Sequence, residues 1–122
     1  MNDSVFPERF QEALFYAATH HAGQLRKGTA IPYITHPLIV AETLAYHYPG
    51  RHDLILAGVL HDVIEDTEST FAEVEARFGT GVAHLVAAVT KPDDHPDLPT
   101  ERLARWRFQR QDLKDGLGRI CQ

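Results

Sequence analysis

The stretch that decides the fold runs from Leu54 to Thr67 and reads Leu-Ile-Leu-Ala-Gly-Val-Leu-His-Asp-Val-Ile-Glu-Asp-Thr. Its first part, residues 54–60, has no charged or polar side chain. A helix that is apolar on every side is a buried helix, because no face of it is suited to water. The sequence therefore predicts a helix over about residues 53–64 that lies at the centre of the molecule.

The segments around this stretch show the period of helices that have one apolar face. They cover about residues 7–23, 37–48, 70–78 and 82–90, and a charged, Arg-rich segment over 100–114 is a further candidate. Thr70 followed by Glu73 has the pattern of a capping box. Residues 23–35, which hold two glycines and a proline, are predicted to form a loop. We expect an all-α bundle of about six helices around the central one.

Composition excludes several classes of function. The chain has 122 residues, enough for one domain, and 12 Lys and Arg against 17 Asp and Glu give a net charge of −5. An acidic chain is poorly suited to bind nucleic acid. The longest apolar run, residues 54–60, is far shorter than the roughly 20 residues that cross a bilayer. A single cysteine, Cys121, and a start without a secretory signal favour the cytoplasm.

The dipeptide His61-Asp62 is the first candidate for chemistry, because it directly follows the apolar run. A buried carboxylate without a partner costs several kcal/mol. On a helix, Asp62 would share a face with Glu65 and Asp66, so three acids would crowd a helix end that already carries partial negative charge. A bound cation, or a reaction that needs a carboxylate base, would explain this arrangement. The alternative is a solvated acidic helix end.

Two further sets of residues complement this cluster. His36 stands before Pro37, whose ring restricts the backbone there, and imidazoles with carboxylates suit Mn²⁺, Fe²⁺ or Zn²⁺ better than Ca²⁺. Arg26 and Lys27 lie on a glycine-flanked loop and could bind phosphate. Considered alone, His36 could be structural and the cationic pair could be an exposed loop tip.

In order and spacing these residues resemble the HD-domain superfamily of metal-dependent phosphohydrolases, and within it the hydrolase domain of RelA/SpoT-type proteins. The resemblance covers about residues 10–90. It rests on the segments His21-Ala-Gly-Gln24-Leu-Arg26-Lys27, Pro32-Tyr-Ile-Thr-His36-Pro-Leu, Ala57-Gly-Val-Leu-His61-Asp62-Val-Ile-Glu65-Asp66-Thr67, Phe78-Gly79 and Leu85-Val86-Ala-Ala-Val-Thr90.

The resemblance implies an all-α HD fold, one Mn²⁺ ion and a guanosine nucleotide as substrate. The implied reaction is hydrolysis of the 3′-pyrophosphate of guanosine tetra- or pentaphosphate to GDP or GTP and pyrophosphate. Each implied role falls on residues already singled out: metal ligands His36, His61 and Asp62; acids that orient and deprotonate the attacking water, Glu65 and Asp66; and nucleotide contacts Arg26 and Lys27.

The family has a fourth metal ligand, an aspartate in a Lys-Leu-Ala-Asp-like segment that begins a later helix. Here residues 115–122 end at about the point where that segment would follow. We therefore expect one HD domain over residues 1–122 that lacks its C-terminal helices, as a fragment, a truncated gene product, or a site with three protein ligands and solvent. Another HD-type nucleotide phosphohydrolase and a catalytically impaired nucleotide-binding module stay open as alternatives.

Overall fold

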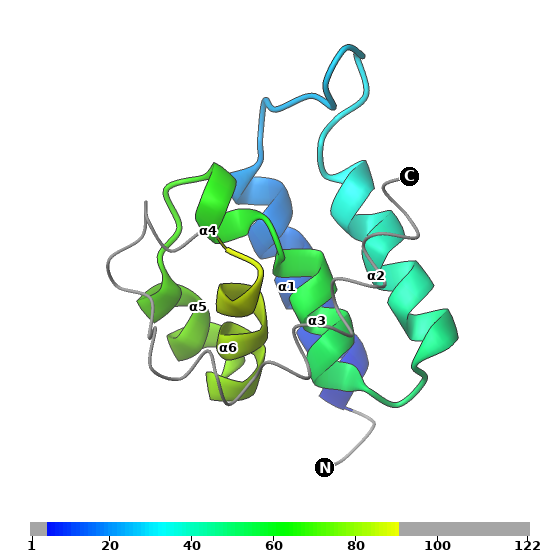
Figure 1. Ribbon diagram of the computed structural model, residues 1–122, viewed down its shortest axis with the longest axis vertical. Helices are drawn as coiled ribbons and strands as arrows, with labels where there is room; N and C mark the ends of the chain where they lie inside the picture. Colours follow the sequence, from blue (N-terminus) through cyan, green and yellow to red (C-terminus); the bar gives the residue numbers. More distant parts are fainter. Residues whose placement is uncertain (1–4, 91–122) are drawn as a thin grey trace.

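The computed structural model describes residues 5–90, and helices dominate them (Figure 1). This part of the chain confirms the expected all-α fold. The sixth expected helix, residues 100–114, and the end of the expected domain lie outside the described residues. The observed helices are α1 (Phe6–His20), α2 (Thr35–His47), α3 (His52–Leu60), α4 (Val63–Asp66), α5 (Phe71–Phe78) and α6 (Thr80–Ala88).

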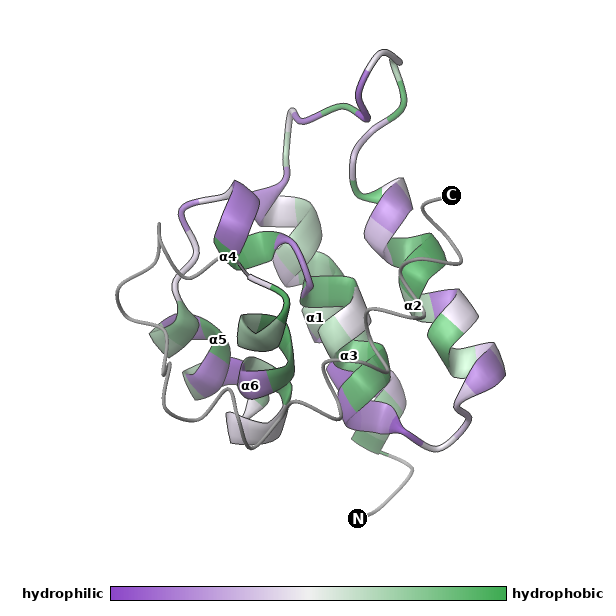
Figure 2. Cartoon of the chain, viewed as in Figure 1, coloured by the Kyte–Doolittle hydropathy of each residue, from purple (hydrophilic) through white to green (hydrophobic). Residues whose placement is uncertain are grey.

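Helix α3 forms the centre of the bundle, as its apolar sequence predicts. It packs against α1, α2 and α6, and every residue from Leu54 to Leu60 is buried. Figure 2 shows the apolar colour along this helix. Gly58 lets α2 approach closely, because a Cβ atom at this position would lie 2.6 Å from Cδ1 of Leu44. The site residues at the end of α3 are therefore anchored to the core.

The structure divides the predicted helix over residues 53–64 into two. Helix α3 ends at Leu60, and Asp62, with φ −104° and ψ 2°, precedes the short helix α4. The Gly58 carbonyl, which would accept from the Asp62 amide in an unbroken helix, lies 2.7 Å from Nδ1 of His61. The Asp66 amide still donates to the Asp62 carbonyl over 2.9 Å, so the helical spacing between these two residues survives the break.

The remaining helix boundaries follow local sequence. The capping box at α5 is confirmed: the Glu73 amide donates to Thr70 Oγ1 over 3.2 Å, and the Thr70 amide donates to Glu73 Oε1 over 3.0 Å. Asp53, which directly follows His52 at the start of α3, lies beside the first turn of α6, since a Cβ atom on Gly81 would be 2.8 Å from Asp53 Oδ2. None of the helices in residues 5–90 is both long and apolar enough to span a membrane.

The loop between α1 and α2 projects beyond the ends of the helices (Figure 1). Two backbone hydrogen bonds close it: the Arg26 amide donates to the Ile31 carbonyl and the Tyr33 amide to the Gln24 carbonyl, each over 2.8 Å. Gly28 has a φ of 74°, a conformation that side chains with a Cβ rarely adopt. The loop is therefore an ordered turn that holds the Arg26-Lys27 pair at one end of the bundle.

Candidate metal centre

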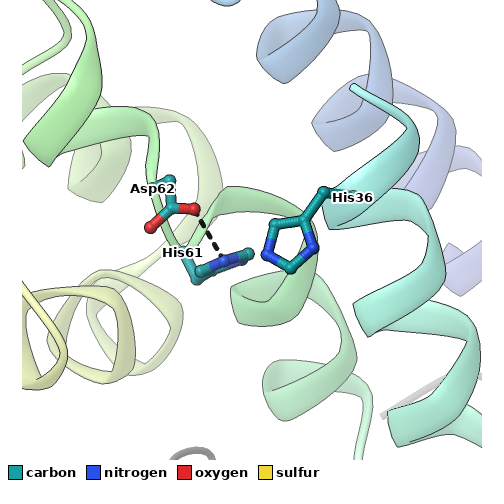
Figure 3. A group of neighbouring side chains, drawn as sticks. All are labelled: His36, His61 and Asp62. Atoms are coloured by element: carbon teal, nitrogen blue, oxygen red, sulfur yellow. Dashed lines mark ion pairs between the residues drawn. The ribbon is translucent and has the colours of Figure 1, made fainter. Parts of the chain in front are cut away.

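His36 comes together with the consecutive residues His61 and Asp62 at the junction of α3 and α4. His36 lies in the first turn of α2, while His61 and Asp62 connect α3 to α4. Their ligand atoms all lie within 4.8 Å of one another, and Figure 3 shows the three side chains converging. Both histidines are buried and Asp62 is partly buried. We call this group the metal cluster.

The hydrogen bonding of His61 tests whether the metal cluster fits a cation. The Gly58 carbonyl can only accept, so Nδ1 of His61 carries a proton and the neutral ring presents a lone pair at Nε2. That atom lies 2.8 Å from Oδ2 of Asp62, which is also an acceptor. Two acceptors repel each other at this distance unless a proton or a cation lies between them. The donor set of two imidazoles and a carboxylate therefore fits a divalent metal ion.

Electrostatics favour the ligand forms of His36 and Asp62. Burial, followed by the charge of His61, lowers the pKa of His36, which keeps its imidazole neutral. Burial opposes ionisation of Asp62, but the hydrogen bonds and charges of its partners outweigh burial and lower the pKa of this carboxyl. For His61, burial alone would favour the neutral ring, yet the hydrogen bond and charge of Asp62 raise its pKa overall. Because a metal ligand must present a lone pair, an ion bound at Nε2 of His61 would compete with a proton for this atom.

Sequence reasoning missed Tyr33, which lies against the metal cluster. Its hydroxyl donates a hydrogen bond to Oδ2 of Asp62. Its ring lies between those of His21 and His36, with centroid distances of 4.8 Å and 5.8 Å. Tyr33 stands three residues before the predicted ligand His36, and this short spacing is the sequence feature that could have identified it. The phenol fixes the orientation of one ligand from the loop side of the site.

Replacing Tyr33 by phenylalanine is expected to weaken metal affinity about 10- to 100-fold, because hydrogen bonds to ligands typically contribute that much. The ring contacts would remain, so the folded state should persist. Metal titration by calorimetry measures the change. Tyr46→Phe is the matched control, since Tyr46 is 86% exposed on α2. Equal affinities in the two variants would show that the phenol hydroxyl does not support the site.

The two predicted catalytic acids lie on α4, directly after the metal cluster. Glu65 is half-buried and Asp66 is exposed. Although Asp66 is exposed, protein atoms around its carboxyl displace part of its hydration and raise its pKa, and the negative charges of Asp62 and Glu65 raise the pKa further. These couplings place Asp66 within the electrostatic field of the cluster, although it is not one of the three grouped ligands. A carboxyl with a raised pKa is a better proton acceptor near neutral pH.

The effect of Glu65 on Asp66 has a definite sign. Glu65→Gln removes a negative charge that disfavours ionisation of Asp66, so the pKa of Asp66 should fall. An NMR titration of side-chain carboxyl carbons in the metal-free protein measures this shift. Glu68→Gln, on the exposed acid that follows α4, is the control and should leave the titration of Asp66 closer to that of the wild type. A pKa unchanged by Glu65→Gln would contradict the coupling.

The predicted nucleotide-binding pair lies on the loop above the cluster. Arg26 is half-buried. Burial and the charges of His61 and Asp62 have the larger effects on the pKa of His36, and the positive charge of Arg26 also lowers it. This coupling places Arg26 near the metal cluster. Lys27 is exposed in the adjacent turn. The structure thus brings one cation of the pair toward the site and leaves the second at the solvent surface.

Comparisons with known proteins identify relatives of this chain. The HD domain family model matches residues 13–114. A guanosine-3′,5′-bis(diphosphate) 3′-pyrophosphohydrolase of Aquifex aeolicus is 48% identical over 84 residues, which are 69% of this chain and 12% of that protein. The human enzyme of the same description, MESH1, is 43% identical over 95 residues, covering 75% of this chain and 52% of the relative.

A solved structure of a metazoan ortholog of SpoT, described as hydrolysing ppGpp, is similar with a TM-score of 0.66 and 36% sequence identity. The similarity covers 78% of this chain and 55% of that structure. The chain therefore spans about half the length of MESH1 and a small part of the Aquifex relative. Because the family model matches most of the sequence, the chain belongs to the HD domain family.

Proposed function

We propose that this chain is a Mn²⁺-dependent hydrolase that removes the 3′-pyrophosphate from guanosine tetra- or pentaphosphate. The observation that carries the proposal is the metal cluster beside the Glu65-Asp66 pair. Relatives that are 43% to 48% identical are named guanosine-3′,5′-bis(diphosphate) 3′-pyrophosphohydrolases, and this supports the substrate. A composition with one cysteine supports a cytoplasmic location.

His36, His61 and Asp62 would hold the ion. A bound divalent ion lowers the pKa of water and offsets the negative charge of phosphate. Mn²⁺ is compatible with a mixed set of imidazole and carboxylate ligands. The buried imidazoles and the hydrogen-bonded carboxylate supply this set before any ion arrives, so little side-chain freedom is lost on binding.

The other residues of the chain would divide the remaining tasks. Water attacks the phosphorus next to the 3′ oxygen, and the bond between this phosphorus and the 3′ oxygen breaks. Asp66, whose pKa is raised, accepts a proton from the water, and Glu65 orients the water. Arg26 and Lys27 bind the negatively charged nucleotide. The 3′ oxygen takes up a proton and leaves as a hydroxyl, and pyrophosphate is released.

A second candidate is a nucleotide-binding module with weak catalysis. The observation that favours it is that the cluster found within residues 5–90 has three ligands. Residues 91–122 lie outside the part of the chain that the structure describes. We keep one HD domain over residues 1–122 as the proposed organisation.

The test mixes purified chain, loaded with Mn²⁺, with guanosine tetraphosphate. We expect GDP and pyrophosphate in equal amounts, and loss of both products after metal removal by a chelator. GTP, ATP and GDP, tested in parallel, separate this activity from that of a general nucleotide phosphohydrolase. A metal-loaded chain that binds the nucleotide but forms no product would support the second candidate and overturn the first.

A further inference from the structure

Gln24 joins three segments around the candidate site through four hydrogen bonds. Its amide donates to the His21 carbonyl over 3.0 Å, and its carbonyl accepts from the Tyr33 amide over 2.8 Å. Its side-chain Nε2 donates to the Asp66 carbonyl over 3.0 Å, and its Oε1 lies 2.9 Å from Nδ1 of His21. One residue therefore connects the end of α1, the loop and the end of α4.

The partners settle the orientation of the Gln24 amide. The Asp66 carbonyl can only accept a hydrogen bond, so the side-chain nitrogen faces it and the side-chain oxygen faces His21. Nδ1 of His21 must then carry the donated proton. His21 is 3% exposed, and its ring packs on Tyr33, so its position is fixed by the core. The side chain of Gln24 thus connects the buried His21 to the end of α4, the helix that carries Glu65 and Asp66.

Helix α4 needs such a link because it has only four residues. A single turn has few internal hydrogen bonds, and the carbonyl groups at a helix end have no partner within the helix. Two side chains bind these carbonyls: Thr67 Oγ1 donates to the Val63 carbonyl, and Gln24 donates to that of Asp66. Of these two residues, Gln24 comes from a distant part of the sequence.

We propose that Gln24 is a positioning residue that fixes the distance between the cationic loop and the acids of α4. The inference rests on the proposed function, in which Arg26 binds the nucleotide and Asp66 accepts a proton. These groups belong to segments that are 40 positions apart, and Gln24 is two residues from Arg26 along the chain. Losing the link would let the two move relative to each other, and a displacement of about 1 Å can lower a rate about 100-fold.

Gln24→Glu is the decisive variant because it has nearly the same shape. It keeps an acceptor for His21 and replaces the donor to Asp66 by an oxygen that repels the Asp66 carbonyl. With guanosine tetraphosphate as substrate, we expect kcat per bound metal to fall about 10- to 100-fold and KM to rise, with metal content unchanged. A merely structural role would reduce the active fraction and leave KM the same. Gln11→Glu, an equal charge change on an exposed position of α1, is the control.

Hydrogen exchange of the metal-free chain gives a readout that does not depend on activity. In Gln24→Glu, amides of the loop and of α4 should exchange at least about tenfold faster than in the wild type, while those of α3 should not change. Unchanged exchange in both segments would overturn the inference, as would wild-type kcat and KM. If the wild type itself does not hydrolyse the nucleotide, the proposed function fails, and the exchange experiment still decides whether Gln24 holds α4.

Discussion

Asp62→Asn is expected to remove metal binding without unfolding the chain. The substitution deletes the negative charge and the anionic ligand atom of the metal cluster. It also changes the contact between Nε2 of His61 and Oδ2 of Asp62, which lie 2.8 Å apart. Both contacts are made by Oδ2, and an asparagine Nδ2 in its place could donate one hydrogen to Nε2 of His61 and the other to the hydroxyl oxygen of Tyr33, so both contacts could be retained with the Tyr33 bond reversed. The metal-free variant should therefore be as thermally stable as the wild type.

Two measurements test this expectation. Metal content after dialysis should fall from one ion per chain to a small fraction. Loss of a residue that only hydrogen-bonds a ligand typically lowers metal affinity about 10- to 100-fold, and loss of a ligand should lower it by more. Circular dichroism should report an unchanged melting midpoint for the metal-free protein. Asp53→Asn is a matched control, because Asp53 also follows a histidine but lies near α6. Stoichiometric metal in Asp62→Asn would exclude Asp62 as a ligand.

The second large effect is expected for Asp66→Asn, which should lower kcat about 10²- to 10⁴-fold, the usual contribution of a general base. The amide cannot accept a proton from water, while its size and the backbone bonds of α4 are retained. Asp66 is exposed and lies outside the group of three ligands, so metal content should not change.

Single-turnover hydrolysis of guanosine tetraphosphate measures this effect independently of product release, and Asp53→Asn again serves as the control. A loss of metal together with activity would reassign Asp66 to the ligand set. A rate equal to that of the wild type would show that Asp66 is not the proton acceptor. Glu65 would then be assigned this role, and Glu65→Gln would have to lower kcat instead.

Periodicity and burial were sufficient to predict the core. The apolar run over residues 54–60 placed α3 at the centre, and the pattern from Thr70 to Glu73 located the start of α5. The crowding of acids after His61 was the basis for predicting a site there, because three like charges at a helix end need a physical reason. The inferences about α3 and α5 succeeded because they depend on the chain within a few residues of each position.

The features that sequence reasoning missed depend on contacts between distant segments or on competition within one turn. The break after α3 coincides with the contact between the His61 ring and the Gly58 carbonyl, which periodicity does not record. Tyr33 and Gln24 stand in the motifs of the resemblance, but their roles require knowing that the two ends of the loop lie beside Asp62 and Asp66. The hydrogen bond between Gln24 and Asp66 joins residues 42 positions apart, so the sequence near either residue does not predict it.

Gly58 has a consequence for anyone who would engineer this chain. Replacing a helical glycine by alanine is a common route to stability, worth up to about 1 kcal/mol from helix propensity. Here an added methyl group would lie 2.6 Å from Cδ1 of Leu44, so that this side chain of α2 would have to move. The same residue orients the His61 ring through its carbonyl. The gain in helix propensity would thus be offset by repacking of Leu44 between the helix that carries His36 and the helix that leads into His61.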